Sequence, residues 1–297
     1  MSDASGEIAL SLVIPLYNEE AVIGDTIREA DRVLSEWGGA FEIIVVDDGS
    51  TDRSYAEARA NGVDSLRLLQ HTTNRGYGAA LKTGFASAKY PWLAIIDADG
   101  SYPIKEIPKL LDNTDEADMV IGERTEYNHY SSQMRRLGKA VLAPLANYLT
   151  STRIPDLNSG MRVMRRKLVE RYWPLIPDGF SLTTTLTMAF LSAGWRVKWI
   201  PVSFHKREGK SKIKPMRDMR NFILLILRTV TYFHPLKVYV PASLILVLSS
   251  IAVVLLSKFL LGNVMDITSL FLFITGLQLL LIGVLADLIL KILGTRE

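Results

Sequence analysis

The chain has 297 residues, a net charge of +3 and no cysteine. Its length is enough for a large hydrophobic core and one or two domains, and the lack of cysteine excludes disulfides and thiolate metal sites. The basic residues gather at 206–237, beside an apolar C-terminal part, which favours anionic lipid headgroups over nucleic acid as a partner.

The first hundred residues alternate between expected strands and expected helices. Apolar runs predict strands at 10–14, 41–46, 66–69 and 92–96. Helical spacing predicts helices that end near Trp37 and Ala88, and Ser50 or Thr51 is expected to cap a helix between the second and third strands. Strands and helices that alternate at this spacing indicate a parallel sheet covered by helices.

Polar clusters follow three of these strands, at 17–20, 47–48 and 97–99. In a parallel sheet these strand ends share one edge, where crowded acidic groups repel one another unless they meet a metal, a sugar or a base. Asp97 and Asp99 can point the same way along extended backbone and share a divalent cation, although Asp and Gly are also common in ordinary turns. The convergence of the three clusters therefore predicts a binding site at this edge.

Polar segments separate the elements that are expected further along the chain. The patterns predict a strand at 119–122, a helix at 131–149, a polar turn at 156–162, a buried helix at 180–193 and a strand at 195–204. Residues 215–234 are expected to form an amphipathic helix, which lies either in a membrane interface or in an ordinary core.

Two uncharged segments, 240–257 and 267–286, approach the roughly 20 apolar residues that cross a bilayer as a helix. The short linker between them predicts a transmembrane hairpin, with a pair of buried core helices as the alternative. The flanking Lys and Arg residues place both hairpin ends, and the N-terminal domain, in the cytoplasm. The expected divisions are a cytoplasmic domain at 1–214, an interfacial helix at 215–236 and, within 237–297, transmembrane helices at about 238–261 and 266–290.

Several motifs occur together in one order, at residues 13–20, 45–52, 74–80, 97–99, 122–124, 159–162 and 207–212. In this order they resemble the family 2 inverting glycosyltransferases of the GT-A fold, and among them the polyprenyl-phosphate hexosyltransferases. The resemblance covers roughly residues 8–215. It implies an α/β, Rossmann-like nucleotide-sugar-binding domain with a mostly parallel sheet, which the transmembrane hairpin follows.

The resemblance also implies roles for single residues. Those that would hold the nucleotide are Pro15, Tyr17, Asn18, Glu19 and Asp47. Those that would bind the donor diphosphate, with Mg2+ or Mn2+ on the two carboxylates, are Asp97, Ala98 and Asp99. An acceptor phosphate would be held by Arg124 and Arg135, and a loop would close over the phosphates with Ser211 and Lys212. The catalytic residues would be Asp99, Arg124 and Arg135.

The implied reaction transfers a hexose from a UDP- or GDP-sugar to a membrane polyprenyl monophosphate, dolichyl or undecaprenyl phosphate, with inversion at C1. A phosphate monoester is already anionic, so catalysis needs positioning and charge neutralisation rather than a general base. The alternatives are a membrane glycosyltransferase with a hydroxyl acceptor, for which Asp156 is the candidate base, and a binding scaffold without turnover. The expected partners are the donor, the lipid, the membrane and another copy of the chain through the hairpin, and no nucleic acid.

Three positions depart from the usual pattern of the family. Ser101-Tyr102 stands where relatives often have a glutamine after the metal motif, and Lys139 stands where they often have a serine. Threonines fill 180–187, where relatives often have an acidic residue. The departures concern the metal motif and the acceptor site, where Arg136 lies next to Arg135.

Overall fold

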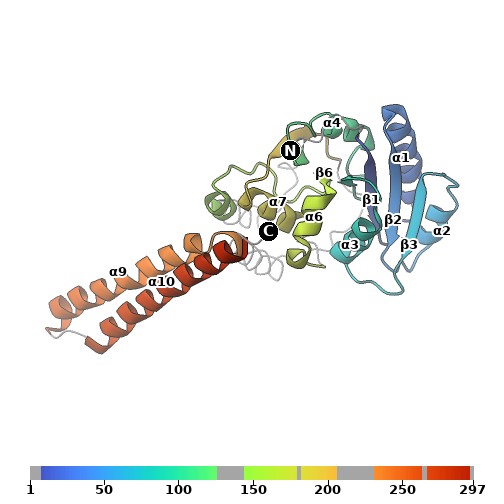
Figure 1. Ribbon diagram of the computed structural model, residues 1–297. Coiled ribbons are helices and arrows are strands. Elements are labelled where there is room, and N and C mark those ends of the chain that lie inside the picture. The colour runs from blue at the N-terminus through green and yellow to red at the C-terminus, as the bar shows by residue number, and fades with distance from the viewer. Residues whose placement is uncertain (1–7, 126–143, 179–181, 206–230, 263–265, 295–297) are drawn as a thin grey trace.

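A seven-stranded sheet with helices on both faces forms the globular part, and a long helical hairpin projects from it (Figure 1). The computed structural model describes residues 8–125, 144–178, 182–205, 231–262 and 266–294. The strands are β1 (Leu10–Leu16), β2 (Phe41–Asp47), β3 (Leu66–Gln70), β4 (Trp92–Ile95), β5 (Met119–Arg124), β6 (Arg162–Arg165) and β7 (Val197–Val202). The helices of the globular part are α1 (Ile23–Trp37), α2 (Ser54–Arg59), α3 (Tyr77–Ser87), η1 (Ile104–Glu106), α4 (Ile107–Leu111), α6 (Arg166–Arg171), η3 (Trp173–Leu175) and α7 (Leu182–Ser192).

The strands lie in the order β3-β2-β1-β4-β6-β5-β7. β1 is parallel to β2 and β4, β2 is parallel to β3, and β5 is parallel to β7. β6 runs antiparallel to both of its neighbours, β4 and β5. The α/β class with a mostly parallel sheet is therefore confirmed, and the ends of β1, β2, β4 and β5 meet at one edge, where β6 begins.

The expectation of a polar turn at 156–162 is wrong at its last residue, because Arg162 opens β6. Arg162, Val163 and Met164 are all buried in this central strand. The strand has only four residues and an arginine at each end, so it shows neither an apolar run nor a clear alternation. The sequence pattern could not reveal it.

The sheet separates two hydrophobic cores. One core packs under α1, α2, η1 and α4, and it takes alternate residues of β1, such as Leu12 and Ile14. The other packs under α3, α6 and α7, and it takes the intervening Val13. Strands that are buried on both faces read as continuous apolar runs, which is why the sequence predicts β1, β2 and β4 well.

The loop after β2 differs from its expected role as a helix cap. α2 begins at Ser54, after Arg53, and neither Ser50 nor Thr51 caps it. Ser50 Oγ instead accepts the amide of Asn18 at 3.0 Å, and the amide of Thr51 donates to Asn18 Oδ1 at 2.8 Å. These two residues join the loop after β1 to the loop after β2, so they serve the sheet edge rather than the helix.

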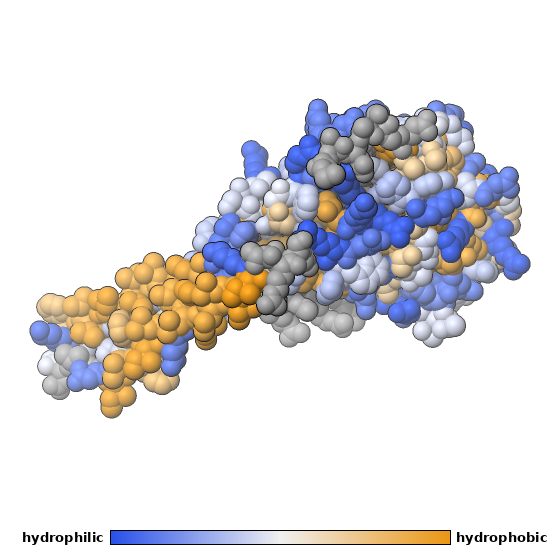
Figure 2. All heavy atoms as spheres, in the orientation of Figure 1, coloured by the Kyte–Doolittle hydropathy of each residue, from blue (hydrophilic) through white to orange (hydrophobic). Residues whose placement is uncertain are grey.

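The C-terminal hairpin consists of α9 (Leu236–Leu261) and α10 (Asp266–Gly294). Both helices are long and apolar enough to cross a membrane, and Figure 2 shows the hydrophobic surface continuing along the hairpin. Two serine hydroxyls join them, since Ser243 Oγ donates to Gly276 O and Ser250 Oγ donates to Ser269 O, each at 2.7 Å. Small residues allow this close approach, as is usual between membrane helices. The predicted hairpin is therefore confirmed.

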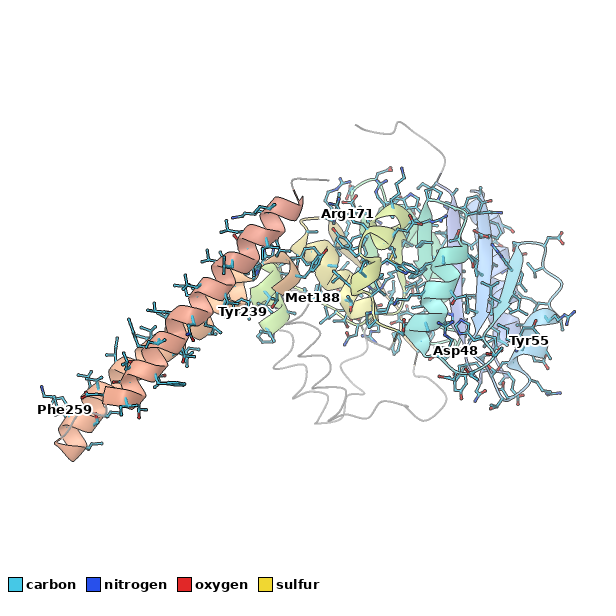
Figure 3. The ribbon with its side chains drawn as sticks, turned by 60° about the horizontal axis from the view of Figure 1, so that its bottom comes forward. Asp48, Tyr55, Arg171, Met188, Tyr239 and Phe259 are labelled. Atoms are coloured by element: carbon cyan, nitrogen blue, oxygen red, sulfur yellow. The ribbon has the colours of Figure 1, made fainter. Side chains whose placement is uncertain are left out.

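The base of the hairpin is attached to the globular part by polar contacts with two helix ends. His234 Nε2 lies 2.9 Å from the carbonyl of Ser192, the last residue of α7. Lys237 Nζ donates to the carbonyl of Leu149 at 2.9 Å, at the end of the helical segment 144–150. Figure 3 shows this junction between Met188 of α7 and Tyr239 of α9. Most of the expected interfacial helix, 215–230, lies outside the described residues.

Candidate active site

The loops after β1 and β2 interlock at the sheet edge. Asn18 has a positive φ of 55°, which an asparagine tolerates better than most residues. Its amide and side chain bind the loop after β2, and the amide of Glu19 donates to Ser54 Oγ at 2.8 Å. Pro15, near the end of β1, and Tyr17, directly after it, are half-buried on either side of the buried Leu16. These contacts hold the residues expected to bind the nucleotide in one place.

Asp47 is fully buried at the end of β2. Its Oδ1 accepts the amide of Ser50 at 3.1 Å, and its Oδ2 accepts Gln70 Nε2 at 3.0 Å. The carboxylate therefore stabilises the turn after β2 and is fixed against the end of β3.

The second aspartate of this pair, Asp48, has a role that the sequence analysis missed. Its carboxylate accepts the amides of Arg75 and Gly76, at 2.9 and 2.7 Å, and contacts His71 Nδ1 at 2.7 Å. The other ring nitrogen of His71 lies 2.9 Å from Thr83 Oγ1. Asp48 and His71 are 23 residues apart, so only the acidic doublet itself hinted at this function. The network holds the segment before α3 at the sheet edge.

Asp97 and Asp99 follow β4 at the same edge and are half-exposed on either side of the buried Ala98. Tyr77 Oη donates to Asp97 Oδ1 at 2.9 Å, and the amide of Ser101 donates to Asp99 Oδ1 at 3.1 Å. Burial, and then the charge of Asp97, raise the pKa of Tyr77 well above its usual value, so it remains a donor. Both carboxylates are accessible, but the expectation of extended backbone is wrong here, because β4 ends at Ile95 and Ala98 and Asp99 lie in a turn.

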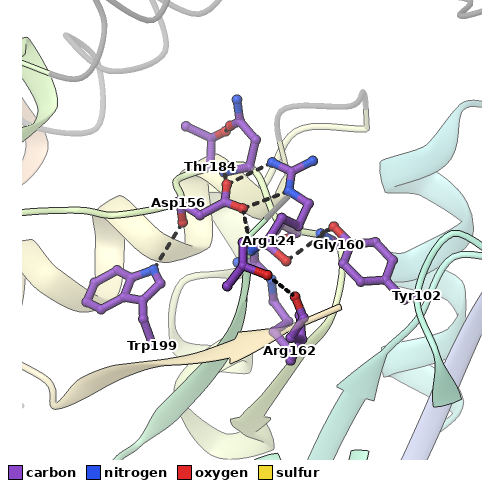
Figure 4. Close-up of polar contacts among 11 residues, drawn as sticks. Tyr102, Arg124, Asp156, Gly160, Arg162, Thr184 and Trp199 are labelled. Carbon is purple, nitrogen blue, oxygen red and sulfur yellow. Dashed lines mark hydrogen bonds and ion pairs between the residues drawn. The ribbon is translucent and has the colours of Figure 1, made fainter. Parts of the chain in front are cut away.

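Tyr102, one of the departures from the family pattern, is buried in the segment that follows Asp99. Its hydroxyl accepts the amide of Gly160 at 2.8 Å and lies 3.2 Å from Ser159 Oγ (Figure 4). Burial raises the pKa of Tyr102 to about 12. The phenol therefore stays protonated and ties the segment before β6 to the segment after β4.

Arg124, at the end of β5, is paired with Asp156. Arg124 Nε and Nη2 donate to the two oxygens of Asp156 at 2.7 and 2.8 Å, a bidentate geometry (Figure 4). The guanidinium also lies 5.4 Å from the ring centroid of Phe204, and Trp199 Nε1 donates to the carbonyl of Asp156 at 3.0 Å. The pair is mostly buried, with side chains 11% and 12% exposed.

The electrostatics of this pair do not suit Asp156 as a general base. Burial alone raises the pKa of Asp156, but the hydrogen bond and charge of Arg124 outweigh it and hold that pKa below its usual value. A carboxylate with a lowered pKa is a weak base, and both of its oxygens are engaged by Arg124.

This pair predicts a pH dependence of stability. A carboxyl whose pKa is lowered by folding stabilises the folded state above its unfolded pKa, and this contribution disappears as the pH falls through the folded pKa. We expect Asp156→Asn to lower Tm at pH 7, and the difference from wild type to shrink below about pH 4. Thermal unfolding between pH 7 and pH 3 measures this. The exposed Asp64→Asn is the control and should show no such difference; a pH-independent gap for Asp156→Asn would contradict the pairing.

Gly160 forms a wall beside Asp97. A Cβ at position 160 would lie 2.5 Å from Asp97 Oδ2, so only glycine leaves room for the carboxylate as it stands. On another side, a cavity of about 240 Å3 opens next to Asp97 between α1 and η1, with Thr26, Lys105 and His205 in its lining. The Asp97 side chain is therefore confined by Gly160 on one side and accessible to solvent through the cavity.

We expect Gly160→Ala to displace Asp97 and to lower kcat/KM for the donor by roughly 10- to 100-fold, because small misplacements of reacting groups are costly. Steady-state kinetics with varied donor measure the effect, together with Tm to show that the fold is kept. Gly24→Ala on α1 is the matched control, since its added Cβ meets nothing closer than 3.5 Å. Equal kcat/KM values for the two variants would contradict the steric constraint that position 160 places on Asp97.

The residues present fit a divalent cation that is coordinated by protein carboxylates and by a substrate together. Among the residues that the structure describes, no cluster of three or more His, Cys, Asp or Glu side chains could hold a metal alone. Mg2+ in enzymes usually keeps waters and uses one or two carboxylates plus substrate phosphates. Asp97 and Asp99 match this pattern, with Gly160 leaving the space beside the first.

Three predicted site residues, Arg135, Ser211 and Lys212, lie outside the described part of the chain, as do Arg136 and Lys139. The remaining ones come together at the single sheet edge, from the ends of β1, β2, β4 and β5.

Comparison with known proteins assigns the chain to a family. Residues 11–173 match the model of glycosyl transferase family 2, and residues 234–292 match the GtrB C-terminal hairpin. The dolichyl-phosphate hexose transferase of Haloferax volcanii is 30% identical over 209 residues, which cover 69% of this chain and 87% of the relative. The dodecaprenyl-phosphate galacturonate synthase of Rhizobium johnstonii is 26% identical, and the match covers 97% of this chain and 89% of the relative.

A third relative matches over a shorter stretch. The undecaprenyl-phosphate 4-deoxy-4-formamido-L-arabinose transferase of Pseudomonas aeruginosa is 32% identical over 59% of this chain and 55% of the relative. Among solved structures, glucosyl-3-phosphoglycerate synthase from Mycobacterium tuberculosis, with Mn2+, UDP and phosphoglyceric acid, has a TM-score of 0.59 at 20% identity, covering 76% of this chain and 79% of that chain. This similarity shows the shared fold. The chain belongs to glycosyl transferase family 2, is a glycosyltransferase, and carries a GtrB C-terminal hairpin with which it associates with membranes.

Proposed function

We propose that this glycosyltransferase moves a hexose from a UDP- or GDP-sugar to a polyprenyl monophosphate, with inversion at C1. The observation that carries the proposal is the mostly buried Arg124–Asp156 pair, which holds a guanidinium at the edge where Asp97 and Asp99 lie. The relatives support it, since several are named as polyprenyl-phosphate sugar transferases.

The proposed roles combine the positions of the described residues at the sheet edge with the family resemblance, which alone supplies the roles of Arg135, Ser211 and Lys212. The nucleotide is held by the ends of β1 and β2, through Pro15, Tyr17, Asn18, Glu19 and Asp47. The donor diphosphate is held at the end of β4, through Asp97, Ala98 and Asp99. The acceptor phosphate is held by Arg124 and Arg135, and Ser211 and Lys212 close over the phosphates.

The reaction needs no proton to be removed from the acceptor. A phosphate oxygen of the lipid forms a bond to C1 of the sugar, while the bond from C1 to the donor diphosphate breaks and its electron pair leaves with the nucleoside diphosphate. Arg124, whose Nε and Nη2 are held by Asp156, attracts and orients the attacking phosphate with its positive charge. A divalent cation, Mg2+ or Mn2+, on Asp97 and Asp99 supplies charge neutralisation to the leaving diphosphate.

We further propose that residues 1–214 form the catalytic domain on the cytoplasmic face, residues 215–236 an interfacial helix, and residues 237–297 the membrane hairpin. The Lys and Arg residues that flank the hairpin support this orientation. The acceptor's tail is insoluble in water, so an enzyme for it has to work at the membrane surface. Assembly of copies through the hairpin stays a prediction, which sedimentation in detergent tests.

A transfer assay tests the reaction. Protein purified in detergent, with Mg2+ or Mn2+, is offered a panel of radiolabelled UDP- and GDP-sugars together with polyprenyl phosphate. We expect label to enter the organic phase from one donor, and EDTA to stop the transfer. Donor hydrolysis without lipid labelling would contradict the acceptor assignment and favour a hydroxyl acceptor, for which a glycolipid panel is the next substrate.

Removing residues 238–297 should separate donor binding from lipid use. The hydrogen bonds of Asp47 with Gln70, of Asp97 with Tyr77 and of Arg124 with Asp156 do not involve the hairpin, so we expect nucleotide-sugar affinity to stay within about twofold. Transfer to a long-chain acceptor in liposomes should fall by more than tenfold, because the truncated enzyme is no longer anchored in the bilayer that contains the acceptor. A short-chain, water-soluble acceptor is the control and should be used as well as by the full chain. Unchanged use of the long-chain lipid would leave the hairpin without a role in acceptor delivery.

A further inference from the structure

Arg162 is the largest fully buried side chain in the described part of the protein. It opens β6 and pairs with Ile95 of β4, two residues before Asp97. Arginine is seldom fully buried unless a carboxylate pairs with it, because burying a charge is costly. The position of Arg162 below the metal motif therefore needs a physical explanation.

The hydrogen bonds of Arg162 go to neutral groups. Nη1 donates to the carbonyl of Thr183 at 2.8 Å and to Thr187 Oγ1 at 3.1 Å, and Nη2 donates to the carbonyl of Ser159. Its Nε has no partner among the described residues. These contacts tie β6 to the first turns of α7, but they leave a full positive charge in the interior, close to a helix N-terminus that favours negative charge.

Four acidic side chains act on this charge. Burial lowers the pKa of Arg162 to about 10, whereas Tyr77, Tyr102, Asp156 and Asp97, in decreasing order, act in the opposite sense, so the guanidinium is protonated at neutral pH. Asp156 already forms the bidentate pair with Arg124. Asp97 packs against Gly160, in the same short segment whose Ser159 carbonyl Arg162 binds. The segment 159–162 thus links the buried Arg162 guanidinium to Asp97, through the Ser159 carbonyl and Gly160.

We propose that Arg162 is a positioning residue that acts as a fixed internal counter-charge for Asp97. It stabilises the carboxylate in the metal-free protein, and it lowers the affinity of Asp97 and Asp99 for a divalent cation until the donor diphosphate adds its own negative charge. The second statement rests on the proposed assignment of these two aspartates to the metal site. The physical basis is Coulombic, since a nearby positive charge of low mobility reduces the negative potential that attracts a cation.

A double-mutant cycle in EDTA tests the counter-charge without any metal. Asp97→Asn keeps an oxygen that can accept from Tyr77 and removes the charge, and Arg162→Gln keeps an amide donor for the neighbouring carbonyls. We expect Asp97→Asn to lower Tm by about 3 °C or more in the wild-type background, and by much less in the Arg162→Gln background.

Asp99→Asn is the matched control for this cycle. Removing one of two crowded carboxylates relieves repulsion, so Asp99→Asn should leave Tm unchanged or raise it in EDTA. A rise of Tm for Asp97→Asn, like that of its neighbour, would overturn the proposal, and so would additive effects of Asp97→Asn and Arg162→Gln. If Arg162→Gln does not fold, the sign of the Asp97→Asn shift in the wild-type background decides alone.

Cation binding without donor tests the second statement. Free Mn2+ is measured by electron paramagnetic resonance in a titration of wild type, Arg162→Gln and Arg162→Lys. We expect Arg162→Gln to bind Mn2+ at least about threefold more tightly than wild type, and Arg162→Lys, which keeps the charge, to bind as wild type. A purely structural role for Arg162 predicts weaker or unchanged binding in both variants, which would overturn the statement.

The two measurements also separate this proposal from the proposed function. If wild type and Arg162→Gln both fail to bind Mn2+ with or without donor, the metal assignment of Asp97 and Asp99 is wrong, and the statement on cation affinity falls with it. The cycle in EDTA involves no cation and no substrate, so the counter-charge stands or falls on its own result.

Discussion

Replacing Asp99 by alanine is expected to reduce sugar transfer by at least about 100-fold, an effect of the size seen when a group that stabilises developing charge is removed. Asp99 and Asp97 are the two accessible carboxylates beyond β4, and a cation held by one of them alone would be weakly bound. The transfer assay measures the loss, and titration with donor in the presence and absence of Mg2+ shows whether the metal-dependent part of donor binding disappears.

Two further variants make this result specific. Asp99→Asn keeps the size of the side chain and should be nearly as inactive, which assigns the loss to charge rather than to shape. Asp64→Ala changes an exposed acid elsewhere on the chain and should keep wild-type turnover. Full turnover of Asp99→Ala, or cellular function retained without it, would remove the metal assignment and revive a binding scaffold without turnover.

Arg124→Ala is expected to lower kcat/KM for the lipid phosphate by about 100-fold while donor affinity changes little, because Asp156 holds the guanidinium at the sheet edge and a guanidinium is a strong partner of phosphate. Kinetics with varied acceptor at saturating donor, and equilibrium binding of donor alone, give the two quantities separately. Equal losses of donor binding and acceptor use would exclude an acceptor role for Arg124.

The partner of Arg124 calls for its own controls. Arg124→Ala leaves the buried Asp156 carboxylate without its counter-charge, so part of the loss could come from local rearrangement. Arg124→Lys keeps the charge and loses the fork, and it should be intermediate in acceptor use and near wild type in Tm. Arg165→Ala removes a more exposed ion pair, with Asp118, near the start of β4 and should leave acceptor use unchanged.

The strands, and the sheet edge at which they end, could be predicted from the sequence wherever one physical signal dominates. β1, β2 and β4 are buried on both faces and so appear as apolar runs, and the polar residues that end them, such as Asp47 and Asp97, mark the shared edge. The apolar hairpin was predictable for a similar reason, since its composition differs from that of the rest of the chain.

Contacts between distant residues were not predictable from one sequence. Asp156 and Arg124 are 32 residues apart, and the sequence assigned them to different roles, whereas the structure makes them one ion pair. Asp48 and His71 were not singled out, although together they fix the segment before α3. Arg162 reads as a surface residue by its type, and only the placement of β6 inside the sheet buries it.

The place of β6 has a consequence for synthesis of the chain. β1 to β4 pair among themselves within residues 10–95, whereas β5 joins that sheet only through β6. About 70 further residues must leave the ribosome before β6 is complete, which takes roughly 4 to 14 seconds at ordinary rates of elongation. Through that interval β4 has no partner strand on the side that β6 later covers. The strands that lead to Asp47 and Asp97 are therefore synthesised before the strand that attaches the Arg124 half of the sheet to them.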